Sequence, residues 1–469
     1  MARVVKKAAA FFDECIEPRS RVLLINPPVH ERRYHWLRWN QPSELLRLSS
    51  WLKTRATRVD VRLYDFMFPD GAGNVSKHKV KDSWREEGQQ LWHFGEPFKE
   101  FEDTIARWLV EKWFPDVIVI TSLTSYWHTS IATLIGKLHT RLGRRQRERT
   151  TLCLYGNYPK FEPEHAAKQD VDAVLADTVD TSWNQPDFRL YLDRYRRGPL
   201  FYGLDIYDQA LPAQIDNCLE VEAAALKLRG IDNGKAPTIT IAFLNDNIGR
   251  SDHRWDDVVG SVESHPKQIV IEGIAGIEPS HLTKPLLEKL KAANVRSLFV
   301  EHARKPGGDL DIEAYSPLIE AMTSEQRAKQ AGRSMSAWLD KAAVTGFVAM
   351  GMLDDNIDSL VRSTLFLNRF FEGVILKPFG YSPLNNPTTE AERDMWRPSE
   401  PCAGSPQWFP FADRGGLRRS DYADLIRWQN LLNKRVKGAT FDFLSDGSVA
   451  KLVRETLVME SWKRHREAR

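Results

Sequence analysis

The stretch Arg21-Val-Leu-Leu-Ile-Asn-Pro-Pro28 decides the fold class of this chain. Its apolar run, Val22 to Ile25, is typical of a strand buried on both faces, and Asn26 with two prolines ends it. An amphipathic helix is predicted over 42–54, and an alternating strand over 59–64. Because a strand, a helix and a second strand form a βαβ unit, this order predicts a parallel sheet.

The alternation of strands and helices continues beyond this unit. Strands are predicted over 116–121, 151–155 and 172–175, and helices over 98–109 and 127–139. A polar insertion over 66–97 interrupts the pattern, and we expect the basic run over 141–149 to be a solvated loop. Residues 1–180 are therefore predicted to form a Rossmann-like α/β domain.

A second α/β region is predicted over 236–383. Its strands are expected over 238–243, 268–272, 295–300, 344–349 and 373–377, and its clearest helices over 279–293 and 355–370. Successive βα units favour a β/α barrel or an open partial barrel, whose reactive face is formed by the loops after the strands. Residues 181–235 are expected to be a helical bridge, and 384–469 a mostly helical C-terminal extension.

The composition of the chain excludes several classes of protein. With 469 residues, 42% of them hydrophobic, the chain can form two or three folded domains and is not a disordered protein. A net charge of +3 gives no support to a nucleic-acid or anionic-lipid surface. No apolar run reaches the roughly 18 residues of a membrane span, and the N-terminal one ends at Asp13, too early for a signal peptide. We expect a cytoplasmic protein without a membrane partner.

Polar residues follow the predicted strands of the first region. These candidate ligand-binding residues are Asn26, Thr121, Ser122, Thr124, Gly156, Asn157 and Tyr158. Ligands of parallel sheets bind outside the carboxyl ends of the strands, and these hydroxyl and amide groups suit a neutral, amide-rich ligand better than a phosphate. Ordinary loop chemistry is the alternative. No G-x-G-x-x-G motif follows the first strand, so a nicotinamide dinucleotide site lacks its main sign.

The second region carries candidate catalytic residues at its predicted strand ends. Glu272, Glu301 and His302 could meet there as a metal site or an acid–base pair. Each glutamate could instead cap a helix or pair with an arginine such as Arg304. Asn247 follows the first strand of this region and could hydrogen-bond a ligand or merely close a turn.

Between Arg21 and Pro383 the chain resembles the cobalamin-binding radical S-adenosylmethionine (radical SAM) proteins. The segments 22–28, 115–121 and 156–165 look like three landmarks of that family's cobalamin-binding domain. The turn Gly276-Ile-Glu-Pro279 is similar to the Gly-Gly-Glu-Pro turn that meets the amino group of SAM, and segments 346–351 and 377–383 resemble later barrel strands. The resemblance implies cobalamin and SAM as cofactors, with Glu278 binding the ammonium group. Glu278 could instead supply negative charge at the N-terminus of the following helix.

The chain departs from the family pattern at the iron–sulfur motif. The family places C-x-x-x-C-x-x-C after the first barrel strand, because three thiolates must hold a [4Fe–4S] cluster. Residues 245–252 contain no cysteine, and the four cysteines, Cys15, Cys153, Cys218 and Cys402, are too scattered for a disulfide framework or a zinc site. We expect no iron–sulfur cluster and no reductive cleavage of SAM. The D-x-H-x-x-G motif of other cobalamin proteins is also absent, but the family commonly lacks it.

Three classes of function follow from these features. The first is a cobalamin-binding protein on a radical SAM scaffold without the cluster, an enzyme that performs non-radical or methyl-transfer chemistry on a small molecule. The second is a non-catalytic corrinoid-responsive regulator or partner subunit, which docks to a protein through the Trp-rich and basic C-terminal region. The third is a cofactor-free barrel enzyme that uses Glu272, Glu301 and His302.

Overall fold

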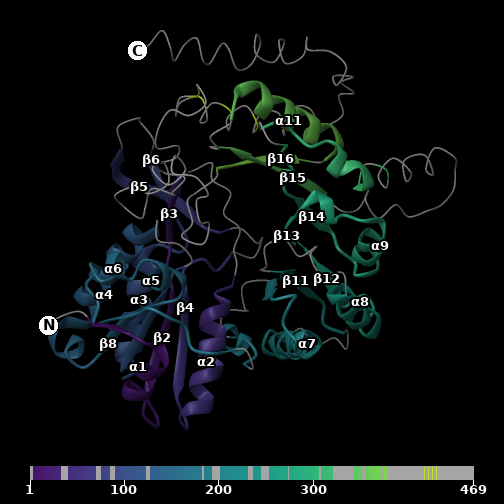
Figure 1. Ribbon diagram of the computed structural model, residues 1–469. Coiled ribbons are helices and arrows are strands. Elements are labelled where there is room, and N and C mark those ends of the chain that lie inside the picture. Colours follow the sequence, from purple (N-terminus) through teal and green to yellow (C-terminus); the bar gives the residue numbers. More distant parts are fainter. Residues whose placement is uncertain are drawn as a thin grey trace. The chain divides into compact units, whose positions relative to one another are not determined.

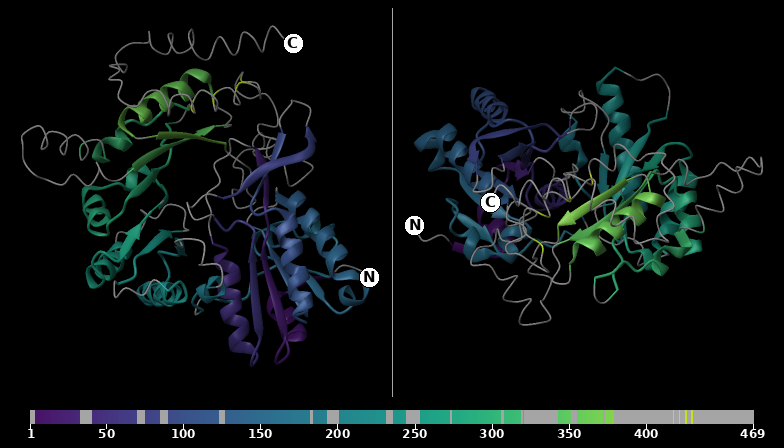
Figure 2. Two further views of the ribbon diagram at one scale, coloured as in Figure 1. Left: turned by 180° about the vertical axis from the view of Figure 1, so that it is seen from behind. Right: turned by 90° about the horizontal axis from the view of Figure 1, so that it is seen from above.

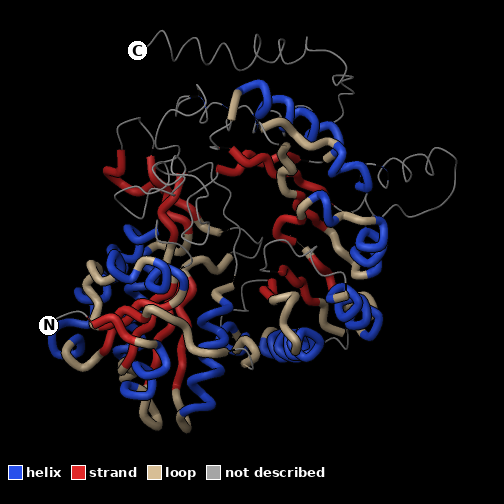
Figure 3. The backbone as a smooth tube through the Cα atoms, viewed as in Figure 1, coloured by secondary structure: helices blue, strands red, loops and turns tan. Residues whose placement is uncertain are grey.

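A computed structural model of the chain shows two compact units. Unit 1 comprises 1–203, 213–237 and 381–408, and unit 2 comprises 204–212, 238–380 and 409–469. Helices and strands alternate along both units (Figure 3). The residues that the structure describes are 4–32, 41–69, 75–84, 90–122, 127–181, 184–192, 201–230, 236–243, 253–272, 274–305, 308–318, 320, 343–350, 355–371, 373–378, 417, 421, 425 and 429. Of the expected C-terminal extension, 384–469, the described residues include only Leu417, Asp421, Leu425 and Gln429.

Unit 1 is built on a parallel six-stranded sheet. Its order is β1 (Val4–Lys6), β9 (Ala173–Leu175), β8 (Thr151–Tyr155), β7 (Val117–Thr121), β2 (Arg21–Asn26) and β4 (Asp60–Asp65). Counted from β2 onward, the strands have the doubly wound order 2-1-3-4-5, with β1 added at the edge beside β9. In this order the topological switch point lies between β2 and β7.

Helices cover both faces of this sheet (Figures 1 and 2). One face packs against α3 (Phe98–Val110) and α4 (His128–Arg147), with Leu23, Ile25 and Ile120 in the shared core. The other face packs against α1 (Ala8–Cys15) and α2 (Ser43–Arg55), where Phe12 meets Trp51 and Tyr155. Successive strand residues point to opposite faces, so burial on both sides explains why the strands are uninterrupted apolar runs.

Two strands of the polar insertion over 66–97 and an earlier strand form an antiparallel sheet, which the sequence did not predict. It consists of β3 (Val29–Arg32), β6 (Gln90–Phe94) and β5 (Lys77–Trp84), in that order. The register places His30 opposite His93, and His93 opposite His78, so three imidazoles share one rung.

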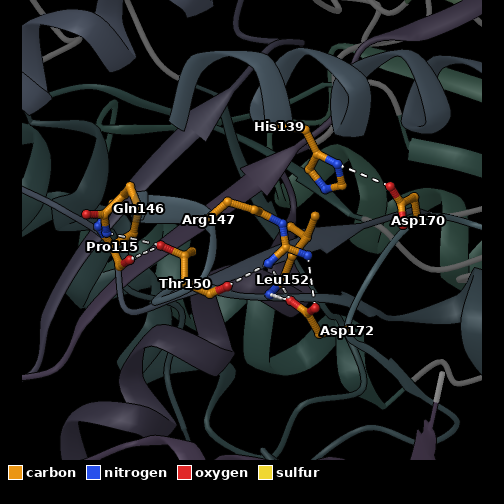
Figure 4. A network of polar contacts seen from close by, with 8 residues as sticks. All are labelled: Pro115, His139, Gln146, Arg147, Thr150, Leu152, Asp170 and Asp172. Carbon is orange, nitrogen blue, oxygen red and sulfur yellow. Dashed lines mark hydrogen bonds and ion pairs between the residues drawn. The ribbon is translucent and has the colours of Figure 1, made fainter. Parts of the chain in front are cut away.

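A polar network joins the end of α4 to the amino ends of β8 and β9 (Figure 4). Arg147 donates two hydrogen bonds to Asp172, at 2.8 and 2.9 Å, and Asp172 also accepts from the Leu152 N–H at 2.8 Å. The prediction of a loop over 141–149 is therefore wrong as far as Arg147. The helix ends at this ion pair, after one non-helical residue at Gly143 (φ 67°).

Unit 2 also consists of parallel strands with intervening helices, which confirms the expected α/β class. Strand β11 (Ile239–Phe243) pairs with β12 (Ile269–Ile271), and a second sheet has the order β13 (Ile274–Ile277), β14 (Ser297–Val300), β15 (Ala343–Met350) and β16 (Gly373–Pro378). The helices between these strands are α8 (Arg254–Ser264), α9 (Lys284–Ala292) and α11 (Ile357–Phe370).

The helix predicted over 279–293 is divided. A 3-10 turn, η4 (Pro279–His281), comes first, and α9 begins only after Thr283, whose hydroxyl accepts a hydrogen bond from the Leu286 N–H. The remaining short or connecting elements are α5 (Asn157–Phe161), α6 (Pro163–Ala166), η2 (Phe188–Tyr191), β10 (Phe201–Leu204), α7 (Leu211–Leu228) and η5 (Glu313–Tyr315). Among the described helices, none is both long and apolar enough for a membrane span.

Candidate functional site

The carboxyl edge of the unit 1 sheet brings several predicted residues together. Asn26 ends β2, Thr121 ends β7, and Gly156 directly follows β8. These strands are parallel neighbours, so their ends lie at one edge, and Asn26 and Thr121 flank the switch point. Thr124 lies outside the described residues.

Asn26 belongs to a saturated hydrogen-bond network around a buried carboxylate. Its Nδ2 donates to Asp65 Oδ1 at 2.7 Å, and the Met67 N–H donates to the same oxygen at 3.0 Å. The hydroxyl of Tyr191 donates to Asp65 Oδ2 at 2.7 Å, and Asp65 is fully buried. These bonds satisfy the carboxylate, so Asp65 holds the edge of the sheet together and fixes the orientation of Asn26.

Gly156 occupies a position that only glycine fits. Its φ is +95°, and a Cβ atom there would lie 2.6 Å from Thr121 Oγ1 and would also overlap Glu44 Oε2. Thr121 Oγ1 donates to Glu44 Oε2 at 3.3 Å. Three elements, α2, β7 and the turn after β8, therefore converge on one small polar cluster.

Glu44 is a site residue that the sequence patterns did not indicate. This residue lies in the first turn of α2, and burial raises the pKa of its carboxyl group, while the Thr121 hydrogen bond and the Lys160 charge lower it by less. The available signal was an acidic residue in the first turn of the helix that follows β2, a position that faces the switch point of a doubly wound sheet.

The residues after Gly156 turn partly into the core. The backbone N–H of Tyr158 donates to the Ser122 carbonyl at 3.1 Å, which ties the ends of β7 and β8 together. The Tyr158 side chain is buried, and its hydroxyl lies 2.7 Å from His165 Nδ1. Asn157 begins α5 at the same edge and is half-buried.

The candidate residues of unit 2 lie at different positions along the direction of the strands. The chain continues past Glu272 as β13, and Ile271 bridges to Val295, whereas Ile277 pairs with Val300. Glu301 therefore lies level with Glu278, and Glu272 lies about five residues, roughly 16 Å of strand, further back. The expected meeting of Glu272 with Glu301 and His302 at the strand ends does not occur, because the register of β13 on β14 places Glu272 further back along the strand.

Glu301 instead packs on β13. A Cβ atom at Gly276 would overlap the Glu301 carboxylate, which explains a glycine inside this strand. Beside it, Glu278 Oε2 lies 3.7 Å from His281 Nδ1. Gly276, Glu278 and Glu301 thus gather at the carboxyl ends of β13 and β14, while Asn247 lies outside the described residues.

His302 is held in one tautomer. Its Nδ1 accepts the Ala349 N–H at 3.2 Å, and its buried Nε2 has no hydrogen-bond partner among the described residues. Burial, together with the charge of Arg304, lowers the pKa of His302 to about 4. At neutral pH the ring is therefore uncharged with its proton on Nε2, and it offers a hydrogen-bond donor rather than a base. Arg304 itself pairs with the buried Asp355 at 2.8 Å.

Within the described residues, no group of three or more His, Cys, Asp or Glu side chains could hold a metal ion. Cys153 and Cys218 are fully buried, and burial raises the pKa of both thiols well above the ordinary value. These two cysteines belong to the core.

No protein-family model and no curated protein sequence matches the chain. Several solved structures resemble it. A radical S-adenosylmethionine methyltransferase, TsrM from Kitasatospora setae, with tryptophan substrate and a SAM analog bound, is 12% identical with a TM-score of 0.49, over 96% of this chain and 99% of that one. The cobalamin-dependent S-adenosylmethionine radical enzyme OxsB, with aqua-cobalamin and S-adenosylmethionine bound, is 12% identical with a TM-score of 0.42, over 78% and 54% of the two chains. Likeness of this degree transfers no ligand to this protein.

Proposed function

We propose that this protein binds cobalamin at the carboxyl edge of the unit 1 sheet. The observation that carries the proposal is the doubly wound order of the sheet, whose switch point is flanked by Asn26 and Thr121. A corrin ring carries a fringe of amides and needs hydroxyl and amide partners together with a close approach to the backbone. Thr121, Asn157 and the Cβ-free surface of Gly156 supply these.

The residues at this edge fit such a ligand. Asn26, Thr121, Ser122, Gly156 and Asn157 would hold it, and none of them carries a charge. The cobalamin landmarks in the sequence meet at this edge, because 22–28 and 115–121 end there and 156–165 begins there. Cobalamin, when bound, supplies a cobalt centre that can carry a methyl group.

For unit 2 we propose a small-molecule site at the carboxyl ends of β13 and β14, with SAM as the first ligand to test. Glu278 lies in the turn whose resemblance implies an ammonium partner, and Glu301 lies level with it. The loop over 245–252 contains no cysteine, so we propose non-radical or methyl-transfer chemistry without an iron–sulfur cluster. We do not favour the cofactor-free acid–base enzyme, because the ring of His302 is neutral and its Nε2 atom donates rather than accepts a proton in a hydrogen bond, and because Glu272 lies far from Glu301.

The test of cobalamin binding is retention of hydroxocobalamin. The full-length protein is mixed with the corrinoid, passed over a desalting column, and its visible spectrum is recorded. We expect about one corrin per chain with wild type and several-fold less with Thr121→Val. Thr133→Val, on the exposed side of α4, is the matched control and should bind like wild type. Colourless wild-type protein would refute the proposal.

A further inference from the structure

Glu44 brings an acidic group into a site that otherwise has uncharged polar residues. Its carboxyl contacts two elements besides its own helix. Oε2 accepts from Thr121 Oγ1 at 3.3 Å, and the same oxygen occupies the space beside Gly156 where any other residue would place its Cβ. The helix that bears it, α2, lies beside the parallel sheet of unit 1 (Figure 1).

We propose that Glu44 is the specificity-determining residue of the switch-point site, where its carboxyl group hydrogen-bonds an uncharged amide of the ligand and excludes an anionic group. This inference rests on the proposed cobalamin site and adds a named residue and a pH dependence to it.

Burial of Glu44 shifts its carboxyl group toward the protonated form. Burial is the largest influence and raises its pKa, although Lys160 from α5 and the Thr121 hydroxyl from β7 act in the opposite direction. Tyr155 from β8 also faces Glu44, and burial raises the pKa of its hydroxyl, so it stays neutral at physiological pH. No positive side chain is hydrogen-bonded to the Glu44 carboxyl among the described contacts.

A protonated carboxyl matches an amide. It offers one O–H donor and one carbonyl acceptor, and a primary amide offers an acceptor and donors in return. An anion such as a phosphate offers acceptors only. It would also be repelled by the Glu44 carboxylate, which forms when the carboxyl group loses its proton. Glu44 therefore selects a neutral, amide-bearing ligand at an edge where doubly wound proteins often bind phosphates.

The sign of the pH dependence follows directly. A ligand that binds the protonated form of Glu44 stabilises that form. Binding is therefore strongest at low pH and weakens as pH rises through the pKa of Glu44. Removing the Thr121 hydroxyl takes away a hydrogen bond that lowers this pKa, and should move the loss of binding to higher pH.

Equilibrium dialysis with cyanocobalamin between pH 5 and 9 tests the inference on the full-length protein. We expect wild-type affinity to fall about tenfold across the range, the Glu44→Gln variant to keep the low-pH affinity at every pH, and the Glu44→Ala variant to bind about tenfold more weakly. Glu100→Gln is the matched control, because Glu100 also lies in the first turn of a helix but is exposed. It should follow the wild-type profile.

Two results overturn the inference. If wild type binds the corrin and Glu44→Gln keeps the wild-type pH profile, Glu44 does not set specificity, although the cobalamin site stands. If wild type binds no corrin at any pH, the proposed function and the inference both fall. Should Glu44→Gln fail to fold by circular dichroism, Thr121→Val decides in its place: an unshifted midpoint refutes the role of Glu44, and a shift to higher pH supports it.

Discussion

The Nδ1 atom of His302 accepts a hydrogen bond from the backbone N–H of Ala349, 3.2 Å away and 47 residues later in the chain. Burial and the nearby charge of Arg304 keep the ring neutral, and the bond from Ala349 places its proton on Nε2. A buried N–H group without a hydrogen-bond partner destabilises the folded state by roughly 1–3 kcal/mol. The Nε2–H group of His302 can therefore donate a hydrogen bond to an acceptor atom of a ligand at the end of β14.

His302 should make unit 2 sensitive to acid. Its folded pKa of about 4 lies below the unfolded value near 6.5, so the folded protein binds fewer protons between these limits. The neutral ring therefore lowers the free energy of unfolding at acid pH only: this free energy is unaffected above about pH 6.5 and decreases as pH falls to about 4, by an amount on the order of 1–3 kcal/mol. Urea unfolding of wild type and His302→Gln at pH 7 and 4.5 measures the difference. An equal loss in both proteins would contradict the assignment.

A second acid-sensitive element is the histidine rung of unit 1. His30 Nε2 lies 3.2 Å from His93 Nδ1, and His93 Nε2 lies 2.9 Å from the Glu96 carbonyl oxygen, an arrangement that suits neutral rings. Burial is the main cause that lowers the pKa of His30 to about 3 and that of His93 to about 4. Both rings should stay uncharged from neutral pH down to about 5, and stability should fall as pH drops below about 6.5. Imidazole resonances followed by NMR give the two midpoints, and values near 6.5 would show that the rung is open to water.

Gly156→Ala should destabilise unit 1 and weaken corrin retention together. The left-handed backbone alone costs a non-glycine residue about 1–2 kcal/mol, and the added Cβ displaces Glu44 and Thr121. Gly136→Ala is the matched control, because this glycine lies inside α4 with open space around it, and alanine should stabilise the helix by up to about 1 kcal/mol. Thermal unfolding and dialysis report the two effects. Equal behaviour of the two variants would show that the cluster around Gly156 does not form.

Glu278, in the turn after β13, should contribute to the affinity of the protein for SAM. Glu278→Gln keeps the shape of the side chain and removes its charge, so an ammonium group should bind at least several-fold more weakly. Glu288→Gln, on the exposed side of α9, controls for a general loss of negative charge. Isothermal titration calorimetry with SAM gives both affinities. Binding that is the same in both variants would refute the role of Glu278.

Iron–sulfur reconstitution tests the proposed loss of the cluster. Three thiolates must converge on one cluster, and the two cysteines at 153 and 218 are fully buried in unit 1. After anaerobic incubation with iron and sulfide, we expect no bound iron after gel filtration. Stoichiometric iron with a broad charge-transfer absorbance would overturn this prediction.

Local patterns in the sequence were enough to predict the main elements. The apolar runs at 22–25 and 117–120 could be read as strands because burial on both faces leaves no polar position, and helices such as α2 show their leucines at helical spacing. The order of these elements then implied parallel sheets, since a helical crossover joins parallel strands. Polar strand ends at Asn26, Thr121 and Gly156 could be named for the same reason.

What only the tertiary structure decided depends on contacts between residues distant in sequence. Glu44 became a site residue because strand order brings α2 to the ends of β7 and β8, and no local pattern records that. Glu272 lies outside the site because the register of β13 on β14 places it about five residues back from Glu301, and no local pattern records that register. The tautomer of His302 depends on Ala349. Periodicity reports which face of an element is buried, but the partners of a polar side chain are set by packing, and these partners determine its charge and its chemistry.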